Sequence, residues 1–156
     1  MAPLDLDALR VSPEPLPPDA PVLRLPRPVL AEMLVHIAAG SPDEACGVLA
    51  GAGGRVTRHF PAANAAATPR TFSEIAPREL VAIWDALDTH GWEMLAYYHS
   101  HPASPACPSP GDLAWARDWP GTLSVIFSLA VPAAPVVRAY LIQGEDVREH
   151  RIEVAP

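Results

Sequence analysis

Three polar residues near the middle of the chain have the types and spacing of a zinc site. His99 and His101 alternate at the end of an apolar segment, so both imidazoles project from one face of a strand. Asp112 follows His101 by eleven residues, at the start of an expected helix. Two imidazoles and one carboxylate are a sufficient ligand set for a catalytic zinc, with the fourth position left to water.

Two further residues, Glu44 and Ser109, would complete such a site for amide hydrolysis. Zinc lowers the pKa of a bound water toward about 7. A nearby carboxylate such as Glu44 can then take the proton and pass it to the leaving amine. The Ser109 hydroxyl can donate a hydrogen bond to the oxyanion of the tetrahedral intermediate.

The stretch from Ser109 to Asp112 also has a purely structural interpretation. A serine cap, a proline at the first helical position and an acid three residues after the cap are typical of a helix start. The two interpretations are compatible, because a helix N-terminus is a rigid mount for a carboxylate ligand and favours negative charge.

The two cysteines and one tryptophan leave alternatives open. Cys107 lies two residues before Ser109, and its thiolate could close the zinc site as a fourth ligand. Cys46 is expected to pack in the core as a small apolar side chain. Trp115 is expected to pack in the core, with contact to a substrate as the alternative.

Hydrophobic periodicity and turn residues predict the elements that position these residues. Helices are expected to open at Pro28 and Pro77, and a short one to span 109–119. Strands are expected at 22–25, 45–50, 55–60, 93–99, 123–130, 136–142 and 147–154. This pattern predicts an α+β fold with a mixed, mostly antiparallel sheet flanked by helices.

Composition bounds the domain organisation and excludes some functions. Residues 1–21 are Pro-rich and acidic, which predicts a flexible tail, and residues 22–156 are expected to form a single domain. A net charge of −7 without a basic patch argues against nucleic-acid binding. No apolar run is long enough for a membrane span. Two cysteines and no secretory signal favour the cytoplasm.

The whole constellation resembles the signature of the JAMM (MPN+) metallopeptidases: a glutamate, then H-[ST]-H-P, a spacer, and S-x-x-D. Here these are Glu44, the segment 99–102, and Ser109 with Asp112. The similarity covers roughly residues 22–154. It implies the deaminase-like α/β sandwich fold of the family. By position it also implies that His99, His101 and Asp112 bind one Zn²⁺ per chain, with Glu44 as general acid/base and Ser109 supporting the oxyanion.

The resemblance further implies a class of reaction and of substrate. Family members hydrolyse amide or isopeptide bonds after the C-terminal Gly-Gly of ubiquitin-like proteins, and short bacterial members resemble this chain most. We therefore expect a zinc metallopeptidase acting on a small ubiquitin-like or sulfur-carrier protein. A homodimer of this chain is left open. Two alternatives stay open: a non-catalytic binding module with a structural metal, and a zinc hydrolase of small peptides or amides.

Overall fold

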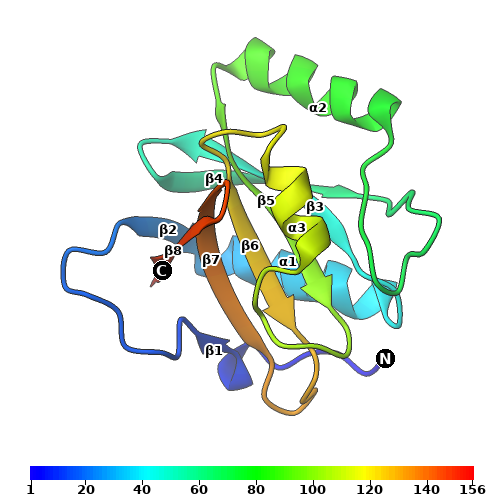
Figure 1. The fold of residues 1–156 in the computed structure, drawn as a ribbon, viewed down its shortest axis with the longest axis vertical. Helices are drawn as coiled ribbons and strands as arrows, with labels where there is room; N and C mark the ends of the chain where they lie inside the picture. The colour runs from blue at the N-terminus through cyan, green and yellow to red at the C-terminus, as the bar shows by residue number, and fades with distance from the viewer.

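A computed structural model describes all residues, 1–156, and its chain alternates strands with three α-helices. Figure 1 shows their arrangement. The helices are α1 (Arg27–Gly40), α2 (Pro77–His90) and α3 (Pro110–Ala116), preceded by a short 3₁₀ turn, η1 (Leu6–Ala8). The strands are β1 (Arg10–Val11), β2 (Val22–Pro26), β3 (Cys46–Ala52), β4 (Arg55–Ala62), β5 (Glu93–His101), β6 (Leu123–Ser128), β7 (Val136–Gln143) and β8 (Asp146–Ala155).

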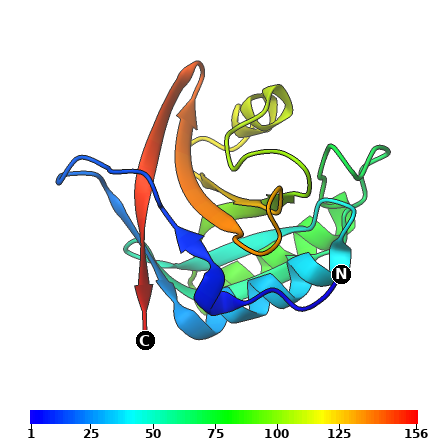
Figure 2. The same cartoon turned by 90° about the horizontal axis from the view of Figure 1, so that it is seen from below.

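The strands form one eight-stranded mixed sheet in the order β1-β7-β6-β5-β3-β4-β2-β8. The hairpin β3–β4 and the pairs β3–β5, β6–β7 and β7–β8 are antiparallel, whereas β5–β6, β2–β8, β2–β4 and β1–β7 are parallel. Because β8 pairs with both β2 and β7, the sheet closes on itself, as the curved strands in Figure 2 show. The mixed α+β architecture predicted from the sequence is confirmed.

Proline sets the start of both long helices, as predicted. Pro28 in α1 and Pro77 in α2 occupy first-turn positions, where a missing N–H costs nothing. Gly91 ends α2 in the left-handed conformation, and its N–H bonds to the last turn. No helix of the structure has both the length and the apolar composition needed to cross a membrane.

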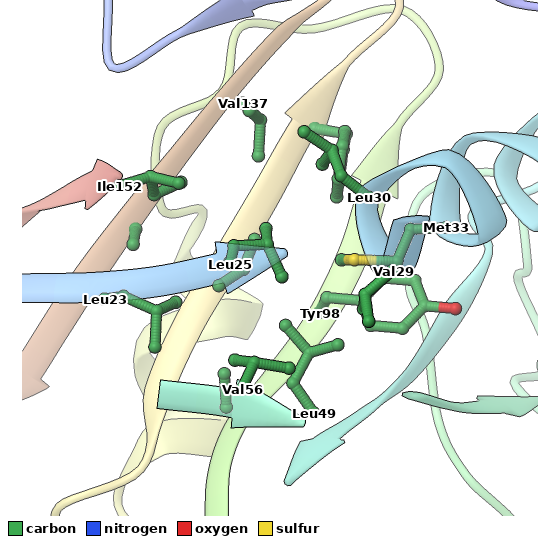
Figure 3. Packing of buried hydrophobic residues seen from close by; sticks show 14 of the residues in the cluster. Leu23, Leu25, Val29, Leu30, Met33, Leu49, Val56, Tyr98, Val137 and Ile152 are labelled. Atoms are coloured by element: carbon green, nitrogen blue, oxygen red, sulfur yellow. The ribbon is translucent and has the colours of Figure 1, made fainter. Parts of the chain in front are cut away.

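The alternation of side chains along β5 divides the core into two faces. Tyr98 packs on one face with α1, in the largest buried cluster, where Leu25, Leu30 and Met33 meet strand residues (Figure 3). Tyr97 faces the opposite side with α2, and its ring stacks on Trp115 of α3. His99 and His101 have the parity of Tyr97, so they lie on the face that α2 and α3 cover.

The N-terminal segment makes defined contacts with the rest of the fold. In β1, Arg10 and Val11 pair with the start of β7, beside the point where β8 leaves that strand. Further along, Ser12 Oγ accepts from the Ile152 N–H at 3.1 Å, and Glu14 forms an ion pair with Arg138 at 2.9 Å. These contacts cover a strand edge that would otherwise be unpaired. The flexible tail expected over residues 1–21 and the domain boundary expected at residue 22 stay predictions.

Candidate metal centre

The pairing of β3 with β5 brings Glu44 to the two histidines. Cys46 lies opposite His99 in the antiparallel ladder, so Glu44, two residues before Cys46, lies beside the end of β5. Two hydrogen bonds join Ser100, near the end of β5, to Ala45. The Ser100 Oγ accepts from the Ala45 N–H at 2.9 Å, and the Ser100 N–H donates to the Ala45 carbonyl at 3.0 Å. Ligand atoms of Glu44, His99 and His101 all lie within 4.8 Å of one another.

Asp112 reaches the same point from the start of α3. Its Oδ1 lies 2.9 Å from His99 Nε2, and its Oδ2 lies 3.2 Å from His101 Nε2. The predicted capping box is present: the Asp112 N–H donates to Ser109 Oγ at 3.2 Å, and the Ser109 N–H donates to Asp112 Oδ2 at 2.8 Å. The structure therefore brings together the five residues that the sequence singled out.

The donor atoms fit a tetrahedral metal ion. The two Nε2 atoms of His99 and His101 lie 3.1 Å apart. Atoms bound to one zinc at its usual bond lengths lie about 3.3 Å from each other. His101 Nδ1 donates to the Pro105 carbonyl at 2.8 Å, which leaves the Nε2 lone pair free for a metal. His99 Nδ1 is buried and has no protein partner.

Burial governs the charge of the two carboxyl groups. Desolvation raises the pKa of Glu44 above its usual value, and the nearby His99 and His101 act against that rise. Burial also opposes the ionisation of Asp112, but its interactions with the imidazoles of His101 and His99 outweigh it and hold the Asp112 pKa well below its usual value. The site thus combines a charged carboxylate against the imidazoles with a more basic carboxyl group beside them.

Two residues that the sequence analysis did not single out support Glu44. Asn64 Nδ2 donates to the Glu44 carbonyl at 2.9 Å and to the Phe72 carbonyl at 2.9 Å. Ser73, which follows Phe72, is 6% exposed, and its hydroxyl, which hydrogen-bonds to the Tyr97 hydroxyl at 2.6 Å, acts against the rise in the Glu44 pKa. No spacing pattern marks these residues, because they reach the site from a loop through tertiary contacts alone.

A narrow hollow lies beside the candidate metal-binding residues, and a wider apolar pocket adjoins the hollow. The hollow, about 10 Å³, is lined by Ser73, His99, Gly111 and Asp112 among others. The pocket, about 260 Å³, shares Tyr97 and Trp115 with it. Its remaining lining comes from the loop before α2, from α2, β5 and the turn after α3: Glu74, Ile75, Pro77, Leu80, Met94 and Trp119.

The two cysteines and Trp115, for which the sequence left alternatives open, lie in different surroundings. Cys46 is fully buried, which confirms its packing role, and burial raises the pKa of its thiol to about 11. Cys107 is exposed, unlike the buried Glu44, His99 and His101. Trp115 is half-buried: it stacks on Tyr97 with ring centroids 4.3 Å apart and also lines the pocket.

Comparison with known proteins identifies relatives of this chain. The family model described as prokaryotic homologs of the JAB domain matches residues 26–143. Desampylase of Haloferax volcanii is 44% identical over 94 residues, 58% of this chain and 67% of the relative. CysO-cysteine peptidase of Mycobacterium tuberculosis is 36% identical over 124 residues, 78% of this chain and 84% of the relative.

A third relative and a solved structure agree with these matches. A Thermus thermophilus protein named "probable TtuB-protein conjugate cleaving protease" is 40% identical over 127 residues, 81% of this chain and 80% of the relative. The solution structure of a Desulfitobacterium hafniense protein superposes with a TM-score of 0.76 at 36% identity, over 86% of this chain and 92% of that one.

Proposed function

The chain belongs to the family of prokaryotic homologs of the JAB domain, and from this membership we propose that it is a zinc metallopeptidase of the JAMM type. Its substrate in this proposal is a small ubiquitin-like or sulfur-carrier protein, cut at the amide or isopeptide bond after a C-terminal Gly-Gly. The observation that carries the proposal is that Glu44 lies within 4.8 Å of both histidines, while Asp112 contacts the Nε2 atoms of the same two histidines. The names of the relatives, which describe peptidases of a CysO-cysteine and of TtuB-protein conjugates, support the substrate class.

The geometry supports the proposed roles. His99, His101 and Asp112 would hold one Zn²⁺, and the ion would supply Lewis-acid activation of a water molecule and polarisation of the scissile carbonyl. Glu44 accepts the proton of the attacking water and delivers it to the leaving amine, a task that its burial favours by making the carboxylate more basic.

The Ser109 hydroxyl accepts one hydrogen bond in the helix cap, and its own hydrogen is not used there. Its Oγ accepts from the Asp112 N–H at 3.2 Å, so the cap does not use the hydroxyl hydrogen. That hydrogen can therefore be donated to the oxyanion of the tetrahedral intermediate.

The two hollows beside the candidate metal-binding residues differ in what they can hold. The hollow of about 10 Å³ has room for little more than a water molecule, which is the size of the attacking nucleophile. The apolar pocket next to it, about 260 Å³, offers a place for an apolar side chain that precedes the glycines.

A substrate panel tests the proposal against its alternatives. Purified protein is incubated with a sulfur-carrier protein extended beyond its Gly-Gly, with the same protein ending in Gly-Ala, and with free dipeptides, and the products are weighed by mass spectrometry. We expect release of the extension from the Gly-Gly protein only. Cleavage of dipeptides in preference would indicate a small-peptide hydrolase, and binding without cleavage would indicate a docking module.

Other expectations stay proposals. A cytoplasmic setting fits two free cysteines. A homodimer and a flexible N-terminal tail remain predictions from the sequence.

A further inference from the structure

The loop between β5 and α3, residues 102–109, connects His101, the last residue of β5, to the helix that carries Asp112. It contains three residues that have no backbone N–H to donate: Pro102, Pro105 and Pro108. Within the loop one backbone hydrogen bond forms, from the Cys107 N–H to the Pro105 carbonyl at 2.9 Å. The loop therefore depends on side chains of other elements to hold its shape.

The Pro105 carbonyl sets the orientation of the His101 ring. His101 Nδ1 lies 2.8 Å from this carbonyl oxygen. Because a carbonyl oxygen can only accept, Nδ1 carries the hydrogen, and Nε2 faces the other way. Nε2 is the atom that contacts Asp112, at 3.2 Å. The position of one loop carbonyl therefore decides which ring nitrogen of His101 is turned toward the candidate metal site.

Two buried hydroxyl groups hold the loop carbonyls on either side of Pro105. Ser128 Oγ donates to the Ser104 carbonyl at 2.7 Å, and the Tyr140 hydroxyl donates to the Ala106 carbonyl at 2.6 Å. Both residues are 6% exposed. Burial raises the pKa of Tyr140 to about 12, so its phenol keeps the hydrogen that it donates. Breaking either bond would leave a buried carbonyl without its donor, which is costly.

The sheet register places both hydroxyl groups on the face that carries the histidines. Ser128 of β6 lies opposite His101 in the β5–β6 ladder. Tyr140 of β7 lies opposite Ser124 of β6, and Ser124 lies opposite Tyr97 of β5. Residues opposite one another share a face, so Ser128 and Tyr140 are on the side of the sheet where the loop passes. Two strands without a candidate metal ligand thus supply the donors.

We propose that Ser128 and Tyr140 are positioning residues, which clamp the loop so that the Pro105 carbonyl holds the His101 ring ready for the metal. This inference rests on the proposed function, in which His101 is a zinc ligand. The peptide groups on both sides of the Pro105 carbonyl are fixed by buried hydrogen bonds, so the carbonyl cannot turn away without breaking one of them. A ring held in this way needs no reordering when the metal binds, which favours tight binding.

Solvent exchange of the His101 Nδ1 proton, followed by nuclear magnetic resonance, tests the clamp directly. In the wild-type protein we expect slow exchange, because the proton is hydrogen-bonded to a fixed carbonyl. In the double variant Ser128→Ala with Tyr140→Phe, exchange should be at least roughly ten-fold faster. Ser128→Thr, which keeps the hydroxyl, should exchange as slowly as the wild type. Equally slow exchange in the double variant would overturn the proposal.

Zinc affinity, measured by competition with a chromogenic chelator, gives a second readout. Ser128→Ala and Tyr140→Phe should each weaken zinc binding, and together by roughly ten-fold or more. Tyr98→Phe is the matched control, because it removes a buried tyrosine hydroxyl that bonds to His59 at 2.7 Å on the opposite face of the sheet. Its zinc affinity should equal that of the wild type. An equal loss in Tyr98→Phe and Tyr140→Phe would show a general effect of lost stability and would overturn the proposal.

The two readouts separate this inference from the proposed function. If the wild-type protein binds no zinc, the proposed function fails. The exchange of the His101 Nδ1 proton in the metal-free chain then still decides whether Ser128 and Tyr140 hold the ring.

Discussion

Ser109 and Asp112 hold each other by reciprocal hydrogen bonds, 2.8 and 3.2 Å long, at the start of α3. The carboxyl group that completes this cap is the one that contacts His99 and His101. In the proposed function, helix capping and metal binding would therefore be two uses of one side chain. The cap fixes the Asp112 rotamer before any metal arrives, which lowers the entropy lost on binding.

This dual use predicts different outcomes for the two residues. Asp112→Ala should weaken zinc retention at least ten-fold, because it removes a ligand. Ser109→Ala should keep the zinc, lose about 1 kcal/mol of stability with the cap, and lower kcat through the oxyanion. Zinc per chain, measured after dialysis against a weak chelator, checks both, and a full complement in Asp112→Ala would refute its role as a ligand.

Glu44→Gln should separate metal binding from turnover. The amide is nearly the same size as the carboxyl group but cannot take a proton, so zinc content should stay at the wild-type level and kcat should fall by about 100-fold or more. Single-turnover mass spectrometry measures the loss. Retained activity would exclude Glu44 as the general base.

The apolar pocket should matter for substrate binding more than for chemistry. Trp119 lines this pocket and not the hollow beside His99, and Trp119→Ala removes apolar contact area. We expect KM for the Gly-Gly protein to rise about ten-fold with kcat and zinc content close to wild type. An unchanged KM would mean that the substrate tail does not use this pocket.

The two cysteines should differ in reactivity. Cys107 is exposed, whereas Cys46 is buried and burial raises its pKa to about 11. A thiol reagent at neutral pH should therefore modify one cysteine per folded chain quickly and the second only after unfolding. Protection of Cys107 by zinc, lifted by a chelator, would instead show that its thiolate is a metal ligand.

Stability should fall in mild acid because of His59, on the sheet face away from the metal-binding residues. Its side chain is 3% exposed, contacts Tyr98 and Glu32, and burial lowers its pKa below the usual 6.5. The unfolded chain then binds the proton more readily. Stability is therefore complete above about pH 6.5 and decreases as the pH falls below it, by at most about 1.4 kcal/mol per pH unit.

The variant His59→Gln tests this assignment. Its unfolding free energy, measured by urea denaturation, should depend less on pH than that of the wild type below about pH 6.5. Equal slopes for the two proteins would show that His59 does not cause the acid sensitivity.

The sequence predicted the elements and the shared face of the two histidines because both depend on local pattern, whereas Glu44 reaches them only through the pairing of β3 with β5. Pro28 and Pro77 mark helix starts, and the alternation of His99 and His101 on a strand fixes their shared face. The residues Asn64 and Ser73 could not be predicted, since their roles depend on a loop folding back on the site. The pairing of β1 with β7 could not be predicted either, because two residues in a Pro-rich segment show no strand pattern.

Metal content and cleavage measured in one sample test the central claim most directly. The chain is purified without added metal, zinc per chain is quantified, and the same sample is incubated with a Gly-Gly-extended sulfur-carrier protein with and without a chelator. The account predicts one zinc per chain and release of the extension after Gly-Gly, abolished by the chelator and restored by zinc. Cleavage that persists in metal-free protein, or no zinc bound even after reconstitution, would contradict it.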